Sequence, residues 1–336
     1  MSYQKLLVTG GLGFIGSSYL RLLLTEHKEI SVVNLDLMTY AANPATLSDF
    51  ESDPRYTFIQ GDIADPETVE QALDGCDAVV NFAAETHVDR SIQDAKPFVH
   101  TNVEGVRVLL EAVKEHGVRM VHVSTDEVYG EVMTGLSRED DAFRPRSPYS
   151  ASKAGGDLLV QAYVATFGAD VVITRGSNNY GPYQFPEKAI PLFITNALDD
   201  KPLPLYGSGR AVRDYIYVFD HVQGIHAALL RGAKGHAYNL GGQNQTDGVA
   251  IATTILDALG KPRDLIEYVR DRPGHDYRYA LDVSKAQREL GWSPRVTFAE
   301  GIAEVVRWYE HNRAWWQGSK DGQAAYFEAQ YAARGS

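Results

Sequence analysis

TGGLGFIG, residues 9–16, joins a short apolar run to an amphipathic run at 14–26. Its glycines Gly10, Gly13 and Gly16 carry no Cβ, so backbone N–H groups and the positive end of a helix can come close to phosphate oxygens. A glycine-rich turn between a strand and a helix is typical of nucleotide-binding α/β folds, although such turns also occur by chance. The turn therefore predicts a phosphate-binding site that the rest of the sequence must support.

The first half of the chain alternates short β-branched apolar runs with helical patterns, which is typical of βαβ units and a parallel sheet covered on both faces. Right-handed crossovers then give an α/β fold with a doubly wound Rossmann sheet, whose ligand crevice lies at the carboxyl ends of the strands. We expect strands at 5–9, 31–36, 57–60, 78–82, 120–124 and 171–175, and helices at 14–26, 66–73, 97–115 and 149–167.

The second half loses this regularity. Prolines and a glycine punctuate residues 181–204, which favours a smaller C-terminal substrate lobe over more sheet. Apolar runs at 215–218 and 237–240 predict further strands, so the two parts are expected to interleave. We expect a cofactor-binding Rossmann domain at 1–175 that regains 215–245, and a substrate lobe at 176–214 and 246–336.

Composition excludes several classes of function. The 336 residues carry a formal net charge of −12 at pH 7, so we expect no nucleic acid partner. No segment reaches the roughly 18 consecutive apolar residues of a membrane span, and the start of the chain lacks the zones of a signal peptide, so we expect a cytoplasmic protein with no membrane contact. Cys76 is the single cysteine and no HExxH occurs, so we expect no disulfide and no metal site.

Acidic and small residues end the expected strands where a dinucleotide would lie. A carboxylate at Asp36 can accept both ribose hydroxyls and would repel a 2′-phosphate, which favours NAD over NADP. Asp62 and Ile63 could pair with the adenine amino group and cover its ring, although Asp62 alone is equally well explained as a turn or helix-capping residue. Ala83 and Ala84 leave room for the dinucleotide backbone. We therefore expect NAD as the cofactor.

Tyr149 and Lys153 lie four residues apart at the start of an expected helix, so they share one helix face. A nearby ammonium favours phenolate, so Lys153 is expected to lower the pKa of Tyr149 from its reference of about 10 toward that of a general base. A YxxxK pair alone also fits an exposed helix pair without function.

A hydroxyl and two carboxylates at the end of the fifth expected strand favour a catalytic role for Tyr149 and Lys153. Thr125 could hydrogen-bond a substrate hydroxyl alongside Tyr149, while Asp126 and Glu127 supply an acid and a base. Adjacent carboxylates in a crevice titrate apart, which leaves one protonated and one ionised. Loss of water from a substrate needs such a pair.

These motifs together resemble the extended short-chain dehydrogenase/reductases, and among them the dTDP-glucose 4,6-dehydratase family. The resemblance runs nearly end to end. In the epimerases similar to this family, an Asp-Glu pair does not follow the threonine or serine, so Asp126 and Glu127 favour a dehydratase. The most specific matching pieces are TGGLGFIGS, NFAAETHVDRS, STDEVYG, SPYSASKA, SNNYGPYQFPEK, VRDYIYV and DRPGHDYRYALD.

The resemblance implies a closed redox cycle on a nucleoside-diphosphate hexose. Tyr149 would remove the C4 hydroxyl proton as hydride passes from C4 to NAD. Glu127 would then abstract the C5 proton while Asp126 protonates the departing C6 hydroxyl, and the hydride returns to C6. Lys153 would orient the nicotinamide ribose, and Thr125 would hold a substrate hydroxyl. The expected product is dTDP-4-keto-6-deoxyglucose.

The resemblance also implies two sets of ligand-binding residues. Arg213 and Arg272 would clamp the diphosphate through charge-assisted bonds, and the alternative is that each forms a structural salt bridge. The residues expected to bind the cofactor are Gly10, Gly13, Phe14, Ile15, Gly16, Asp36, Asp62, Ile63, Ala83, Ala84, Tyr149, Lys153 and Asn178. The residues expected to bind the nucleotide sugar are Glu85, His87, Thr125, Asn179, Lys188, Arg213, Asn239, Arg272, His275 and Tyr279.

Some questions stay open at this point. Gly176 stands where many relatives have cysteine, and residues 243–249 depart from the usual pattern. The nucleotide base, which could be thymine, uracil or guanine, is therefore less certain than the reaction. The alternative functions are a nucleotide-sugar 4-epimerase or decarboxylase and a non-catalytic NAD-binding protein. Helices 97–115 and 149–167 resemble those that pair relatives into homodimers through a four-helix bundle, or they simply cover the sheet.

Overall fold

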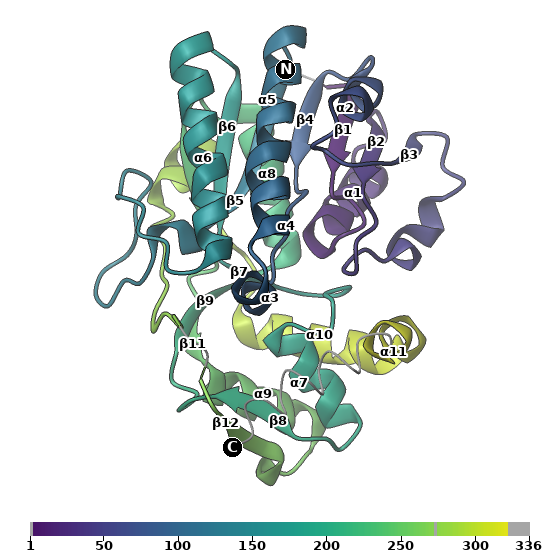
Figure 1. Cartoon of the computed structure of the whole chain (residues 1–336). Coiled ribbons are helices and arrows are strands. Elements are labelled where there is room, and N and C mark those ends of the chain that lie inside the picture. The colour runs from purple at the N-terminus through teal and green to yellow at the C-terminus, as the bar shows by residue number, and fades with distance from the viewer. Residues whose placement is uncertain (1–2, 272–273, 322–336) are drawn as a thin grey trace.

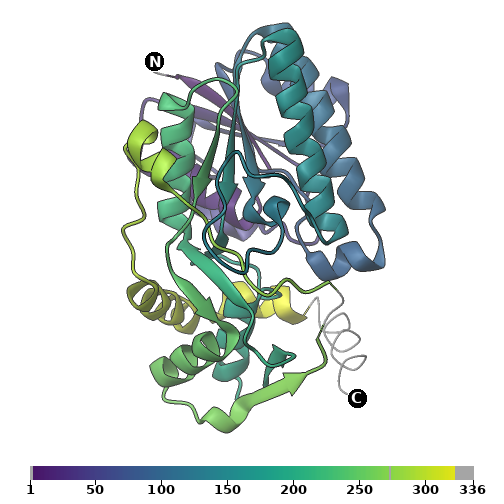
Figure 2. The same ribbon diagram turned by 90° about the vertical axis from the view of Figure 1, so that its left-hand side faces the viewer.

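A computed structural model describes residues 3–271 and 274–321 of the chain. A seven-stranded sheet with its helices forms the larger part, and a smaller lobe of short sheets and helices lies at one end of the strands (Figure 1). The same two parts remain distinct in the view turned by 90° (Figure 2). The site described below lies where the strands of the large sheet end.

The large sheet is parallel throughout and has the order β10-β6-β5-β4-β1-β2-β3. The chain order reverses between β1 and β4, which is the switch point where such sheets open a crevice for ligands. Its strands are β1 (Lys5–Thr9), β2 (Ser31–Asp36), β3 (Tyr56–Gln60), β4 (Ala78–Asn81), β5 (Arg119–Thr125), β6 (Val171–Gly176) and β10 (Ala237–Leu240). The doubly wound sheet predicted from the sequence is therefore present.

Side chains of the central strands point alternately to the two faces of the sheet, and each face has its own apolar core. Leu6 and Val8 of β1 belong to one core, and Leu7 belongs to the other. The first core is closed by α1 (Phe14–Glu26) and α8 (Val218–Arg231), which pack against each other. The second is closed by α2 (Pro66–Leu73), α5 (Val106–His116) and α6 (Pro148–Phe167).

The expected helix 97–115 is divided in the structure. It consists of α4 (Lys96–Val99), the π-helical segment η2 (His100–Gly105) and α5. A π-helical turn inside a longer helix often marks a functional site. Here it carries the buried Asn102, whose side chain bonds the backbone of Glu85 and the hydroxyl of Ser152.

The smaller lobe has its own apolar core, formed largely by α7, α9 and α10. Its strands form a three-stranded sheet, β11-β9-β7, and a two-stranded sheet, β12-β8. These are β7 (Asn178–Tyr180), β8 (Leu203–Tyr206), β9 (Val212–Tyr217), β11 (Gln245–Asp247) and β12 (Ile266–Val269). Its helices are α7 (Ala189–Leu198), α9 (Gly248–Leu259), α10 (Phe298–His311) and α11 (Arg313–Asp321).

Short helices complete the described chain and refine the expected division. They are α3 (Val88–Gln93), η1 (Pro44–Phe50), η3 (Asp126–Tyr129), η4 (Arg263–Leu265) and η5 (Ala286–Leu290). The expected return of 215–245 to the large part corresponds to α8 and β10, whereas residues 212–217 form β9 of the lobe sheet. Leu281, Leu290 and Trp292 lie in the stretch expected to form the lobe but pack with the core of the large sheet.

No helix in residues 3–271 and 274–321 is long and apolar enough to cross a membrane.

Candidate active site

A cavity of about 500 Å³ lies between the carboxyl ends of the large sheet and the smaller lobe. Most of the residues expected to bind ligands line it, although they come from distant parts of the sequence. The expected residues that line it are Gly10, Gly13, Phe14, Ile15, Gly16, Asp36, Asp62, Ile63, Ala83, Ala84, Glu85, His87, Thr125, Asp126, Glu127, Tyr149, Lys153, Asn178, Asn179, Lys188, Arg213 and His275.

The glycine turn after β1 is packed too tightly for side chains, as Gly10 and Gly16 show. Gly10 has φ of +70°, and a Cβ there would lie 2.6 Å from the backbone nitrogen of Ala83. A Cβ on Gly16 would lie 2.2 Å from the carbonyl oxygen of Gly10. The turn thus brings bare backbone to the start of α1, as a pyrophosphate requires.

The Asp36 carboxylate at the end of β2 is 8% exposed and lines the cavity. Its Oδ2 accepts the N–H of Leu12 at 2.9 Å, and its Oδ1 accepts that of Met38 at 2.8 Å. Because each carboxylate oxygen has two lone pairs, one acceptor position on each oxygen is left for a ribose hydroxyl. Together with the glycine turn, this donor and acceptor set fits NAD.

Asp62 is held by two contacts inside the protein. Its Oδ1 accepts the N–H of Ala64 at 2.8 Å, which is the turn role considered as an alternative. Its Oδ2 lies 2.8 Å from Nε2 of His100. Ile63 is buried and lines the cavity beside it. Asp62 would therefore meet adenine as an acceptor held in a fixed position.

The carboxylate pair starts η3, directly after β5. The Thr125 hydroxyl caps this helix by accepting the N–H of Glu127 at 3.3 Å, and it donates to Oδ1 of Asp126 at 3.3 Å. Asp126 is 3% exposed, and its Oδ2 has no hydrogen-bond partner among the described residues. Burial, followed by the charges of Glu127 and Asp214, raises the pKa of Asp126 well above its usual value. The neutral, acidic form of Asp126 is thus favoured.

Tyr149 and Lys153 lie in the first two turns of α6 and are both buried. Burial and the Glu127 carboxylate raise the pKa of Tyr149, and a hydrogen bond with Thr125 opposes this. Burial lowers the pKa of Lys153 to about 8, and its ammonium donates to the carbonyl of Val123 at 2.8 Å. The expectation that Lys153 lowers the pKa of Tyr149 is therefore wrong for this structure, because desolvation and Glu127 dominate.

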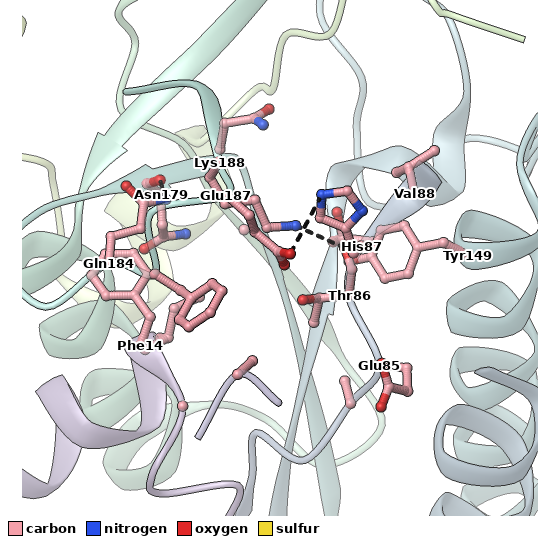
Figure 3. A pocket seen from close by; sticks show the side chains of 18 of the residues that line it. Phe14, Glu85, Thr86, His87, Val88, Tyr149, Asn179, Gln184, Glu187 and Lys188 are labelled. Atoms are coloured by element: carbon pink, nitrogen blue, oxygen red, sulfur yellow. Dashed lines mark hydrogen bonds and ion pairs between the residues drawn. The ribbon is translucent and has the colours of Figure 1, made fainter. Parts of the chain in front are cut away.

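Two charged residues of the lobe point toward the loop after β4 in Figure 3. Lys188 donates to the carbonyl of Thr86 at 3.0 Å. Oε2 of the buried Glu187 lies 3.9 Å from Nε2 of His87 and 3.4 Å from the Arg90 guanidinium. Burial raises the pKa of Glu85 in the same loop, although the positive charge of Arg90 opposes this effect. These contacts join the lobe to the large sheet at the cavity wall.

Arg213 lines the cavity and is held in place by backbone carbonyls. Its guanidinium donates to the carbonyls of Val212 at 2.8 Å and Asp276 at 2.7 Å, and lies 4.5 Å above the ring of Tyr279. No carboxylate in the described residues forms an ion pair with it, so its charge remains available to an anionic ligand. Tyr279 itself is buried behind Arg213, donates to the Asp276 carboxylate and does not line the cavity.

The remaining expected substrate residues differ in position. His275 lines the cavity and pairs with Asp271, with Nδ1 and Oδ1 2.7 Å apart. Arg272 lies outside the described residues. Asn239 does not line the cavity, because its amide is fully buried and bonds the Tyr129 hydroxyl and the carbonyl of Ser137. The prediction that Asn239 binds substrate is therefore not supported.

Sequence reasoning missed several polar residues that line the cavity, and three of them are Gln184, Glu187 and His221. The first two lie inside the quoted motif SNNYGPYQFPEK, so the motif contained the signal. His221 gave no signal, because only the fold brings α8 against the end of β6. The His221 ring lies so close to Gly176 that a Cβ at that position would be 2.6 Å from Nε2 of the ring.

Among the described residues, no group of three or more His, Cys, Asp or Glu side chains could hold a metal ion.

The sequence is similar to known proteins along most of its length. The sequence profile of the GDP-mannose 4,6 dehydratase family matches residues 7–305. The dTDP-glucose 4,6-dehydratase of Streptomyces niveus is 47% identical over 327 residues, which cover 96% of this chain and 97% of that protein.

Solved structures agree in fold. The dTDP-glucose 4,6-dehydratase of Streptomyces venezuelae, crystallised with NAD, has a TM-score of 0.92 and 50% identity over 94% of this chain and 100% of that one. The UDP-glucuronic acid 4-epimerase of Bacillus cereus, also in complex with NAD, has a TM-score of 0.86 and 32% identity over 91% of this chain and 99% of that one.

Proposed function

The chain belongs to the GDP-mannose 4,6-dehydratase family, and we propose that within this family it acts as a dTDP-glucose 4,6-dehydratase. It converts dTDP-glucose to dTDP-4-keto-6-deoxyglucose and water, with NAD as its cofactor. When bound, NAD supplies a hydride acceptor for the first half of the cycle and a hydride donor for the second, so the net reaction is dehydration without net oxidation.

The observation that carries this proposal is the buried Asp126 carboxyl directly beside Glu127 at the cavity wall. A dehydratase must protonate a poor leaving group at C6 while it removes a proton from C5. Burial and the adjacent Glu127 carboxylate keep the Asp126 proton in place, which suits a general acid. Glu127 is half-buried at the cavity wall and is the base in this proposal.

Tyr149 accepts the C4 hydroxyl proton in the proposed first step. Its pKa is raised by burial, so positive charge near the phenol must favour the ionised form during the reaction. Lys153, one helical turn away, does not outweigh this burial in the protein alone, so the positively charged nicotinamide ring of bound NAD would have to add to its charge. Thr125 holds Tyr149, Asp126 and Glu127 in one hydrogen-bonded group, which supports a concerted role.

Ligand binding follows from the cavity walls. The glycine turn, Asp36 and the Asp62–Ile63 turn would hold NAD. Arg213 would contact the diphosphate, since its guanidinium is pre-positioned by two carbonyls and its charge is not paired within the described residues. Lys188, Asn179 and His275 would contact the nucleotide sugar from the lobe. Tyr279 would support Arg213 from behind.

A 4-epimerase is the alternative that shares this fold. An epimerase needs Tyr149, Lys153 and NAD but no acid at C6, so it gives no reason for a buried Asp126 carboxyl beside Glu127. The identities of 47% and 50% with dTDP-glucose 4,6-dehydratases, against 32% with an epimerase, favour the same conclusion.

Incubation of the purified protein with dTDP-glucose tests the proposal. We expect the alkali-induced absorbance of a 4-keto sugar and the loss of one water by mass spectrometry. A product of unchanged mass would indicate an epimerase, and conversion of only a UDP- or GDP-hexose would change the substrate but keep the reaction.

We also propose a homodimer through α5 and α6, which run side by side on one face of the sheet (Figure 1). The outer face of α6 carries the exposed residues Leu158, Ala162 and Ala165 at helical spacing, and Leu158 is 54% exposed. Such a small apolar stripe suits close packing of a second copy of the same helix. The division into a Rossmann domain and a nucleotide-sugar lobe, and the cytoplasmic location, remain predictions.

A further inference from the structure

A buried polar network runs through the large sheet behind the catalytic face of α6. Asp157 lies one helical turn after Lys153 and is fully buried. Its Oδ2 accepts the Nε–H of Arg175 at 2.8 Å, and its Oδ1 lies 3.6 Å from Nε2 of His122. Arg175 and His122 are also buried, with 1% and 0% exposure. None of these three residues lines the cavity or takes part in the mechanism above.

Hydrogen bonds fix the tautomer of His122. The Thr9 hydroxyl donates to Oδ1 of Asn81 at 2.6 Å, so the Asn81 amide nitrogen must be the donor toward Nδ1 of His122 at 3.1 Å. His122 therefore carries its proton on Nε2, which faces Asp157. Burial, followed by the charges of Lys153 and Arg175, lowers the pKa of His122 well below its usual value, so this histidine is neutral.

The charges of the network are unequal. Arg175 and the protonated Lys153 are two cations, and Asp157 is the single anion of the cluster. Asp157 also acts electrostatically on two titratable groups, Tyr149 and Tyr129. Burial lowers the pKa of Lys153, and the negative charge of Asp157 opposes this effect. Without it, an ammonium in this position would lose its proton more easily.

The far side of the network anchors Asp157. Arg175 donates to the Tyr129 hydroxyl at 2.7 Å, and Tyr129 donates to Asn239 at 2.8 Å. Tyr129 ends η3, the helix that begins with Asp126 and Glu127. The carboxylate is therefore tied to the element that carries the proposed acid and base, as well as to the helix that carries Tyr149 and Lys153.

We propose that Asp157 is a positioning residue of this enzyme: its carboxylate lies one helical turn from Lys153 and, through Arg175, aligns the catalytic turn of α6 with η3. The proposal rests on the proposed function for its catalytic consequence, but the charge state of Lys153 can be measured without substrate or NAD.

The first test follows the protonation of Lys153 directly. Protein labelled with 13C at lysine Cε is titrated by NMR, and the Lys153 signal is assigned by its loss in Lys153→Met. We expect a midpoint near pH 8 in the wild type. In Asp157→Asn the midpoint should fall by about one pH unit or more, and Asp157→Glu should restore it. Glu267→Gln, which removes an exposed carboxylate on β12, should leave it unchanged.

The second test uses the pH dependence of kcat with dTDP-glucose. Because the proposed reaction needs a charged Lys153, activity falls as pH rises through its pKa, and this alkaline limb should move to lower pH in Asp157→Asn. The KM for dTDP-glucose should change little, because Asp157 does not line the cavity.

A folded Asp157→Asn protein with an unchanged Lys153 midpoint would overturn the proposal, even if its activity were low. Should this variant fail to fold, Arg175→Gln decides, because it frees Asp157 to act on Lys153 alone and the midpoint should then rise. A lower or unchanged Lys153 midpoint in Arg175→Gln would also overturn the proposal. Lack of turnover by the wild type would contradict the proposed function, but it would not affect the NMR titration of Lys153.

Discussion

The hydroxyl of Thr125 lies 3.3 Å from Oδ1 of Asp126, while the other oxygen of that carboxyl is buried without a partner among the described residues. A buried carboxyl with one weak hydrogen bond is more stable in its neutral form. Burial thus favours the acidic form of Asp126 where the proposed reaction must release water. It also carries a cost in folding stability, as catalytic groups often do.

Replacement of Asp126 by Asn should separate these two effects. We expect kcat to fall by about 10²- to 10⁴-fold, the usual contribution of general acid catalysis. The melting temperature at pH 7 should rise by a few degrees. The sign follows because the folded state raises the pKa of Asp126, so its stability is highest below the unfolded pKa and falls as pH rises. Thermal melts between pH 5 and 9 and turnover assays check both.

The exposed residue Asp140 provides the control for this prediction. Asp140→Asn should change neither activity nor melting temperature by much. An Asp126→Asn enzyme that kept wild-type turnover would contradict the acid role, and one that melted lower at every pH would contradict the electrostatic explanation.

Replacement of Glu127 by Gln should stop the cycle after oxidation at C4. Tyr149 and Lys153 stay in place, so a single turnover should still produce reduced NAD and the 4-keto hexose. Loss of the C5 proton should slow by about 10²-fold or more, because the neutral amide is not a base. The measurement is the absorbance of reduced NAD together with deuterium exchange at C5. Rapid exchange at C5 in Glu127→Gln would exclude Glu127 as the base.

The sequence predicted those parts of the site that depend on residues near each other in the chain. The glycine turn, the Asp126–Glu127 pair and the Tyr149–Lys153 pair each follow a strand or begin a helix, so a short motif fixes their geometry. The bounds of β1 and β2 were likewise predictable from their apolar runs.

Properties that depend on distant packing were not predictable from the sequence. Asn239 follows the expected strand pattern, but β10 pairs with β6 in a position that directs its amide to Tyr129 and Ser137 and away from the cavity. The pKa of Tyr149 was predicted with the wrong sign, because spacing shows the ammonium four residues away but not the burial of the tyrosine side chain. Burial is a property of the whole fold, and here it exceeds the local charge effect.

Gly176 and His221 form a contact that leaves no room for a side chain. A Cβ at position 176 would lie 2.6 Å from Nε2 of His221, whose Nδ1 bonds the Asn179 amide oxygen at 2.9 Å. Gly176→Ala should therefore displace His221 and destabilise the protein by about 1–3 kcal/mol, the usual effect of overpacking. Since Asn179 lines the cavity, the KM for dTDP-glucose should rise more than kcat falls.

A double-mutant cycle checks this explanation. In a His221→Ala background the ring is absent, so Gly176→Ala should cost little further stability. Equal destabilisation in both backgrounds would show that the effect comes from the backbone at position 176 and not from the histidine.

The outer face of α6 should determine the oligomeric state. Leu158 is 54% exposed, although most leucines of the large sheet and its helices are buried, and Ala162 and Ala165 extend the same face. A second copy of α6 would remove Leu158 from water, whereas a glutamate there would place two like charges near the axis of a symmetric dimer. Leu158→Glu should therefore convert a dimer to a monomer in light scattering. Leu230→Glu, at an exposed leucine of α8 on the other face of the sheet, is the matched control for added charge. If the wild type is already a monomer at micromolar concentration, or if Leu158→Glu remains a dimer, then α6 covers the sheet without forming the interface.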